Sequence, residues 1–180
     1  MTFIISIYDT ETTGLHSSRL IEEKHKPELI EFSAVKIDID TKTRIKEYDF
    51  LVKPVRPISA ESVKITGITD DMVKDCLPFA NHVSEIRDAL ENCDAVLAHN
   101  LSFDMEMIDT EFERCGMKLK WPDRKICTVE ETICMKGYRM SLSDLHKELC
   151  GMSFEGAHRA MQDVNALVRC VEILFDRGFI

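Results

Sequence analysis

Near the start of the chain, the stretch Phe3-Ile-Ile-Ser-Ile-Tyr-Asp9 has the side-chain alternation that is typical of a β-strand. Successive side chains of a strand point to opposite faces, so the residues at odd positions, which include Asp9, share one face. Two further β-rich runs follow at 29–39 and 45–52, separated by a short polar turn. Three successive strands with short links predict an antiparallel meander.

The character of the sequence changes after Pro54 and Pro57. The patterns predict helices over 78–91, 104–115 and 141–149, and a short buried strand over 95–98. A final helix is indicated by apolar residues at 3-and-4 spacing, namely Ala160, Val164, Leu167, Val168, Val171, Leu174 and Phe175. Strands first, then helices alternating with short strands, predict an α/β fold in which helices pack on a mixed sheet. No repeat or linker interrupts the chain, so residues 1–180 are expected to form a single domain.

Composition describes an ordinary globular chain, with 44% hydrophobic and 31% charged residues. No apolar run approaches the roughly 20 residues that span a bilayer. The seven cysteines include no C-x-x-C pair, which disfavours a zinc cage. Free thiols and the absence of a targeting segment favour a reducing, cytoplasmic compartment.

The formal net charge of −9 argues against binding along a phosphate backbone. The objection weakens if carboxylates gather around divalent cations, because four carboxylates and two Mg²⁺ sum to zero. An acidic chain can therefore bind a nucleic-acid end, but it is poorly suited to a long duplex.

Asp9 and Glu11 stand two apart at the end of the first strand, so their carboxylates project together. They continue the face that should meet the core, where two acids repel each other unless a cation lies between them. The alternative interpretation is that the strand ends at Asp9 and that both are solvated turn residues beside Gly14.

Asp163 lies inside the apolar stripe of the last helix, three residues after Ala160 and four before Leu167. An unpaired buried carboxylate costs several kcal/mol, so it requires a partner or a metal. The alternative is a charged residue at the rim of the stripe. Asp104 heads a similar row with Ile108, and it could equally be a first-turn acid that favours the helix dipole.

His158 stands just before the last helix. Residues five apart on a helix differ by about 140° around its axis, so His158 and Asp163 would diverge if both were helical. We therefore expect His158 on the entry loop, over the pocket that contains Asp163. Taken alone, it could also be a cap or a surface residue.

Three blocks of the sequence resemble the motifs of the DEDDh 3′→5′ exonucleases, the family of the bacterial polymerase proofreading subunit. They are Tyr8-Asp-Thr-Glu-Thr-Thr-Gly-Leu15, Ala98-His-Asn-Leu-Ser-Phe-Asp104 and Gly156-Ala-His-Arg-Ala-Met-Gln-Asp163. The segments Arg56-Pro-Ile58 and Thr66-Gly-Ile-Thr69 resemble the family's P-I…G-I-T region, although many members have His where Thr66 stands. The resemblance runs in the family's order from about residue 5 to residue 175.

The resemblance implies a ribonuclease H-like fold: a five-stranded mixed sheet, with its first three strands antiparallel and helices on both faces. It implies two Mg²⁺, replaceable by Mn²⁺, held by Asp9, Glu11, Asp104 and Asp163. Asp9 would bridge the two ions, and His158 would act as the general base. These are hard oxygen ligands, as Mg²⁺ prefers.

The resemblance also implies a nucleotide-binding groove. The turn after the first motif (Thr12, Thr13, Gly14 and Leu15) would hold the last nucleotide, with Leu15 wedged against its base. His99, Asn100 and Phe103 would line the same groove, with Phe103 as a stacking surface. Gly14 could instead be a simple turn glycine and Phe103 a core residue. The polar stretch 16–27 has no evident family counterpart and is expected to be an exposed loop near the site.

The implied substrate is a nucleic-acid 3′ end, with single-stranded DNA favoured over RNA, and no membrane is involved. A polymerase, or another replication or repair protein, is the candidate protein partner. An RNA-trimming exonuclease or oligoribonuclease of the same superfamily would use the same metal chemistry and differ in its sugar contacts. A non-catalytic nucleic-acid-binding module is a third hypothesis. It predicts the loss of at least one of the acidic ligands, and none is missing.

Overall fold

A computed structural model describes residues 2–14 and 26–180, and its centre is a five-stranded sheet in the order β3-β2-β1-β4-β5. The strands are β1 (Ile4–Thr12), β2 (Leu29–Asp38), β3 (Thr43–Leu51), β4 (Ala95–Ala98) and β5 (Arg124–Cys127). β1 pairs antiparallel with β2, and β2 with β3, whereas β4 is parallel to both β1 and β5. The predicted mixed sheet with an antiparallel first half is therefore confirmed.

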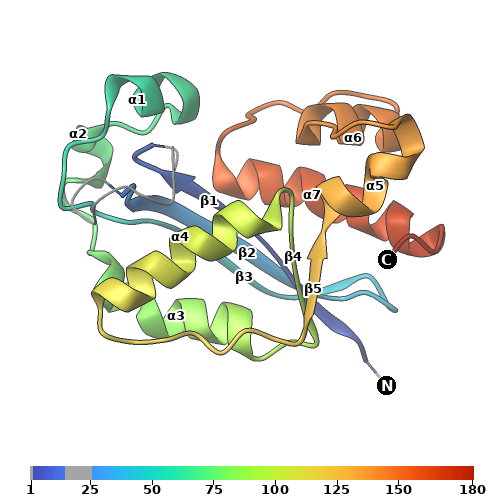
Figure 1. Ribbon diagram of the computed structural model, residues 1–180, viewed down its shortest axis with the longest axis horizontal. Coiled ribbons are helices and arrows are strands. Elements are labelled where there is room, and N and C mark those ends of the chain that lie inside the picture. Colours follow the sequence, from blue (N-terminus) through green and yellow to red (C-terminus); the bar gives the residue numbers. More distant parts are fainter. Residues whose placement is uncertain (1, 15–25) are drawn as a thin grey trace.

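Seven helices complete the described part of the chain (Figure 1). They are α1 (Ala60–Thr66), α2 (Asp70–Val73), α3 (Phe79–Glu91), α4 (Leu101–Arg114), α5 (Thr128–Lys136), α6 (Leu142–Cys150) and α7 (Ala160–Asp176). The sequence patterns predicted α3, α4, α6 and α7 to within a few residues. They missed α1, α2, α5 and β5.

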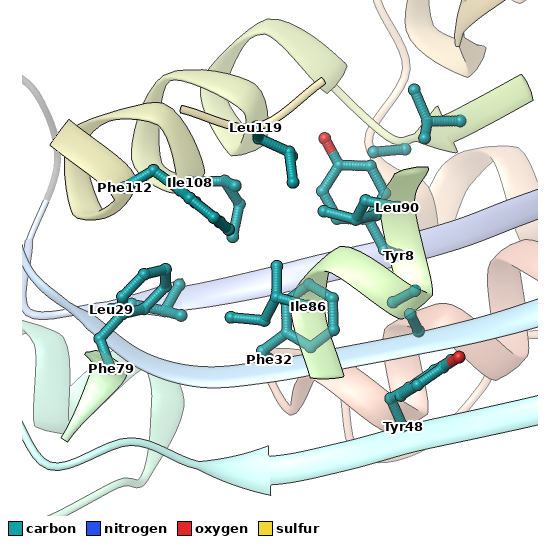
Figure 2. Close-up of a cluster of buried hydrophobic side chains, with 14 of the residues drawn as sticks. Tyr8, Leu29, Phe32, Tyr48, Phe79, Ile86, Leu90, Ile108, Phe112 and Leu119 are labelled. Atoms are coloured by element: carbon teal, nitrogen blue, oxygen red, sulfur yellow. The ribbon is translucent and has the colours of Figure 1, made fainter. Parts of the chain in front are cut away.

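Helices cover both faces of the sheet, as the resemblance implied. On one face α3 and α4 pack against Tyr8 and Phe32, where Ile86, Ile108 and Phe112 fill the space between the layers (Figure 2). On the other face α7 packs against the opposite sides of β1, β2 and β4. Along β1, Tyr8 faces α3 and α4, whereas Ile5 and Ile7 face α7. The odd-numbered residues of β1 therefore lie on the α7 face.

The last turn of several helices ends on a left-handed glycine, and α6 also begins with a side-chain cap. Ser141 accepts a hydrogen bond from the Asp144 amide at 3.1 Å, and Gly151 ends the helix with φ at 75°. An Asp or Ser before the helix and a Gly after it are the usual signals for such boundaries. Ser141 and Gly151 thus bound α6, and the loop that leads to His158 starts at Gly151.

No helix in the described ranges is long and apolar enough to cross a membrane. All seven cysteines, each of them within these ranges, are free thiols.

Candidate active site

The odd-numbered residues at the end of β1 bring Asp9 and Glu11 onto the face that α7 covers. Ile5 and Ile7 of the same strand pack against Val164 and Leu167 of α7. β1 continues past Asp9 to Thr12, so the two acids belong to the strand and not to a turn. The interpretation of both as solvated turn residues is therefore wrong.

Asp163 lies in the first turn of α7 and is 8% exposed, so it is not a rim residue. One of its carboxylate oxygens accepts the backbone N–H of His158 at 2.8 Å. His158 precedes the helix, is exposed, and has its backbone in the left-handed region with φ at 68°. Such a φ is uncommon for a residue with a Cβ and indicates that the surrounding contacts fix this backbone.

Asp104 reaches the site from α4 on the other face of the sheet. The residue is 3% exposed, and its Oδ1 accepts a hydrogen bond from the Thr10 hydroxyl at 2.7 Å. Thr10 is an even-numbered residue of β1, so it points toward α4 while its neighbours Asp9 and Glu11 point toward α7. The first and second motifs thus meet at the end of one strand.

Burial raises the pKa values of all four carboxylates, and the charges of neighbouring acids add to this effect for Asp9 and Glu11. Burial raises the pKa of Glu11 to about 8, with the charges of Asp163 and Asp104 adding to the effect. Burial likewise raises the pKa of Asp104 to about 7 and that of Asp163 to about 6. The pKa of Asp9 is raised well above its usual value by burial and by Asp104, Glu11 and Asp163. A group of acids that repel each other in this way has the electrostatics of a cation site.

Part of this group could hold a metal ion. Glu11, His158 and Asp163 each offer one ligand atom, and these three atoms lie within 4.8 Å of one another. Oxygen atoms dominate the wider set of Asp9, Glu11, Asp104 and Asp163, and such donors suit a hard divalent cation. The donor chemistry of the four acids therefore fits the implied ion, and Glu11, His158 and Asp163 are also close enough to share one.

A cleft of about 430 Å³ opens beside these acids. Its walls come from the end of β1, from α1 with the segment before it, from the first turn of α4, and from the entry to α7. The lining residues are Thr10, Glu11, Thr12, Gly14, Ser59, Glu61, Ser62, Ile65, Thr66, Phe103 and His158. Phe103 is half-buried at this wall, so the interpretation of it as a plain core residue is wrong.

Several residues of the predicted groove lie elsewhere. Thr13 is tied to Glu28, since its N–H donates to the Glu28 carbonyl and its hydroxyl accepts the Glu28 amide, both at 2.9 Å. The His99 ring contacts the Thr128 hydroxyl at 2.9 Å and the Met140 carbonyl at 3.1 Å. Asn100 accepts a hydrogen bond from Arg139 at 3.1 Å. Leu15 and most of the 16–27 loop lie outside the described residues.

Sequence reasoning missed the contribution of α1 to the cleft. Ser62 donates its hydroxyl to the Thr12 carbonyl at 2.5 Å and so joins α1 to the end of β1. The available signal was Ser59, which caps α1 by accepting the Ser62 amide at 3.1 Å, with Gly67 in the left-handed region at its end. Thr66, the departure from the family pattern, is buried and bonds to the Ser62 carbonyl within the helix.

The fold and this group of acids define a nuclease of the ribonuclease H-like class, and comparison with known proteins identifies the family. The exonuclease family model matches residues 6–171. The chain therefore belongs to the exonuclease family, and the resemblance of its motifs to the DEDDh 3′→5′ exonucleases is confirmed.

Two relatives are DNA polymerase components. The chain is 32% identical over 129 residues to DNA polymerase III subunit epsilon of Haemophilus influenzae, a match that covers 72% of this chain and 48% of that protein. It is 32% identical over 160 residues to the PolC-type DNA polymerase III of Pediococcus pentosaceus, covering 87% of this chain and 10% of the relative. The chain thus spans about half or less of these two proteins.

Solved structures share the fold over almost the whole chain. The nuclease domain of 3′hExo, a DEDDh family member bound to rAMP, gives a TM-score of 0.78 with 18% identity over 98% of this chain and 94% of that one. Exonuclease X in complex with 5′-overhanging duplex DNA gives a TM-score of 0.70 with 23% identity. That match covers 97% of this chain and 93% of the other. The predicted ribonuclease H-like fold is confirmed.

Proposed function

We propose that this chain removes single nucleotides from the 3′ end of single-stranded DNA, and that two divalent cations support the hydrolysis. The observation that carries the proposal is the gathering of four carboxylates and one histidine, from three distant motifs, at one end of the sheet. Burial raises the pKa values of all four acids, and neighbouring acids raise those of Asp9 and Glu11 further. An arrangement of this kind is unfavourable unless a ligand of positive charge completes it.

Asp9, Glu11, Asp104 and Asp163 would hold the cations, which we take to be Mg²⁺. Asp9 would be central to this set, because its carboxyl feels the charges of all three other acids. When bound, the cations would supply a more acidic water for the attack and positive charge for the scissile phosphate. Thr10 orients Asp104 through its hydroxyl, and the His158 amide orients Asp163.

His158 would accept the proton of the attacking water. Its ring is exposed at the cleft, and one ring nitrogen lies within 4.8 Å of ligand oxygens of Glu11 and Asp163. Histidine is the side chain that most often serves as a general base. The exposed position also lets the ring pass the proton on to solvent.

The cleft would hold the terminal nucleotide. Its volume of about 430 Å³ is within the range of small-ligand pockets. Thr12 and Gly14 would approach the nucleotide with their backbone, and Phe103 would stack on a base. Thr13, His99 and Asn100 would support this cleft from behind, since their described contacts are made to other parts of the protein.

DNA is favoured over RNA because the two relatives that are 32% identical to this chain are DNA polymerase III proteins. The solved structure of a 3′-exonuclease on a histone mRNA stem-loop shares the fold at only 19% identity. A single strand is favoured because a net charge of −9 opposes extended contact with a duplex. By the same relationship, a DNA polymerase is the candidate protein partner.

The test is digestion of one DNA oligomer labelled at either end, in the presence of Mg²⁺. We expect a 5′ label to yield a ladder that shortens by one nucleotide at a time, and a 3′ label to yield labelled mononucleotide at once. Chelation of the metal and the Asp9→Ala variant should each stop both reactions. Early products of intermediate length from the 3′-labelled strand would refute exonuclease action, and faster loss of RNA of the same sequence would reassign the substrate.

A further inference from the structure

A fifth carboxylate, that of Glu31 in β2, lies beside the acidic group. Glu31 stands directly opposite Glu11 in the register of β1 and β2, and its side chain is 3% exposed. Oε1 accepts hydrogen bonds from Arg159 Nη2 at 2.7 Å and Nε at 3.1 Å, and Oε2 accepts the Ala160 amide at 2.9 Å. Both oxygens are therefore committed to N–H donors, so Glu31 is poorly placed to bind a cation.

These bonds fix the chain immediately after His158. Arg159 precedes α7 in an extended conformation and makes no side-chain cap, while Glu31 takes the N–H of the first helical residue, Ala160. A negative group at this position also suits the positive end of the helix dipole. His158 itself has a left-handed backbone, and its own N–H is held by Asp163. The backbone around His158 is thus fixed on both sides, by Asp163 at residue 158 and by Glu31 at residue 160.

Arg159 also balances the charge of Glu31. The carboxylate of Glu31 raises the pKa values of Glu11, Asp9 and Asp163, whereas the Arg159 guanidinium lowers that of Glu11. Without Arg159, five negative groups would face one another at this end of the sheet. The pair adds two fixed groups to the site and no net charge.

We propose that Glu31 and Arg159 form a positioning clamp that holds His158 over the acids in the orientation needed for proton transfer. This proposal rests on the proposed role of His158 as general base. Neither Glu31 nor Arg159 touches the reacting atoms. They act through the backbone of residues 158–160.

The first test measures the clamp without metal or substrate. Amide hydrogen exchange of Ala160, followed by NMR, should be roughly 5–10-fold faster in Arg159→Met and in Glu31→Gln than in the wild type. Arg159→Met removes the guanidinium that orients the Glu31 carboxylate, and Glu31→Gln removes the charge of the acceptor. Arg44→Met is the matched control, since Arg44 bonds to Asn165 of the same helix at 2.6 Å but lies away from the clamp. Unchanged exchange at Ala160 in both clamp variants would overturn the proposal.

The second test separates positioning from charge. Arg159→Met leaves Glu31 uncompensated, so Mn²⁺ should bind about threefold or more tightly, and Glu31→Gln should weaken Mn²⁺ binding by a similar factor. Both variants should lower kcat, by roughly 10- to 100-fold, because a small misplacement of a reacting group has effects of this size. In the double variant, Mn²⁺ affinity should return to the wild-type value while kcat stays low.

Three outcomes would count against the clamp. Wild-type kcat in the double variant would show that the pair acts through charge alone. Parallel loss of kcat, Mn²⁺ binding and thermal stability would show that it serves folding alone. If Arg159→Met does not fold, Arg159→Lys replaces it, and wild-type kcat together with faster Ala160 exchange would then overturn the proposal. A wild-type protein without exonuclease activity would instead refute the proposed function, and the exchange test would still stand.

Discussion

Two polar clusters flank the sheet of this protein, and they differ in how their charges are satisfied. In the cluster formed by Lys36, Lys46, Tyr48 and Asp88, each charge has a partner. The Asp88 carboxylate accepts Lys46 at 2.6 Å and the Tyr48 hydroxyl at 2.7 Å, and hydrogen bonds from these two groups lower the pKa of Asp88 to about 2. In the acidic cluster of Asp9, Glu11, Asp104 and Asp163, the pKa values are raised instead. A cluster satisfied within the chain serves folding, whereas one left uncompensated is suited to binding a ligand.

The largest expected difference between the two clusters is in catalysis. Asp9→Ala or Asp163→Ala should abolish hydrolysis, because each removes a proposed metal ligand, while the fold stays near intact. The measurement is single-turnover digestion of labelled DNA, with circular dichroism to check the fold. Retained turnover in either variant would refute the ligand assignment.

His158→Ala should have a smaller but still large effect. Loss of a positioned general base typically lowers a rate by roughly 10²–10⁴-fold, and the four carboxylates would still hold the metal. The comparison to make is kcat at neutral pH beside Mn²⁺ affinity from calorimetry. A variant with the wild-type rate would remove His158 from the mechanism, and one that no longer binds Mn²⁺ would make it a ligand instead.

The acidic cluster should also make the stability of the metal-free protein depend on pH. The folded-state pKa values of Glu11, Asp104 and Asp163 are raised to about 8, about 7 and about 6, so the folded protein holds more protons than the unfolded chain above pH 4. The stabilisation is fully present below about pH 4, the ordinary carboxyl range, and is lost as pH rises toward 8. Urea unfolding of the metal-free protein should therefore show a loss of several kcal/mol over this window.

Saturating Mg²⁺ should flatten this pH dependence, since a cation stabilises the ionised form. Equal stability of the metal-free protein at pH 5 and pH 8 would contradict the claim that the acidic cluster is uncompensated.

The smallest effect is expected from the satisfied cluster. Asp88→Asn weakens a half-exposed ion pair with Lys46, so the free energy of unfolding should fall by about 1 kcal/mol or less. Turnover should remain at the wild-type level. A marked loss of activity in this variant would show that the two clusters do not have separate roles.

Local patterns predicted the elements that carry a strong apolar signal. β1, the short buried β4 and the amphipathic α7 all carry this signal, and Asp163 was notable because it interrupts the apolar stripe. β5 was missed because only Ile126 among its four residues is buried, while Arg124 and Lys125 are exposed. The short helix α5 carries only a weak amphipathic pattern and escaped for a similar reason.

The residues of the site that could not be predicted depend on pairing across the fold. Glu31 is one acid in a β-rich run, and its importance arises from the register that sets it opposite Glu11 and from the distant Arg159. His99 belongs to a motif, yet its ring contacts depend on α5 and on the loop before α6, which no local pattern specifies. Motifs identified the acids, whereas tertiary pairing determines what surrounds them.

The central claim is that the fold gathers acids from three distant motifs into one pocket for divalent cations. Calorimetric titration with Mn²⁺ tests it most directly, using the wild type, Asp9→Ala and Asp88→Asn. We predict two bound ions per chain in the wild type and in Asp88→Asn, and the loss of at least one in Asp9→Ala. Absence of Mn²⁺ binding in the wild type, or equal binding in all three proteins, would contradict the account.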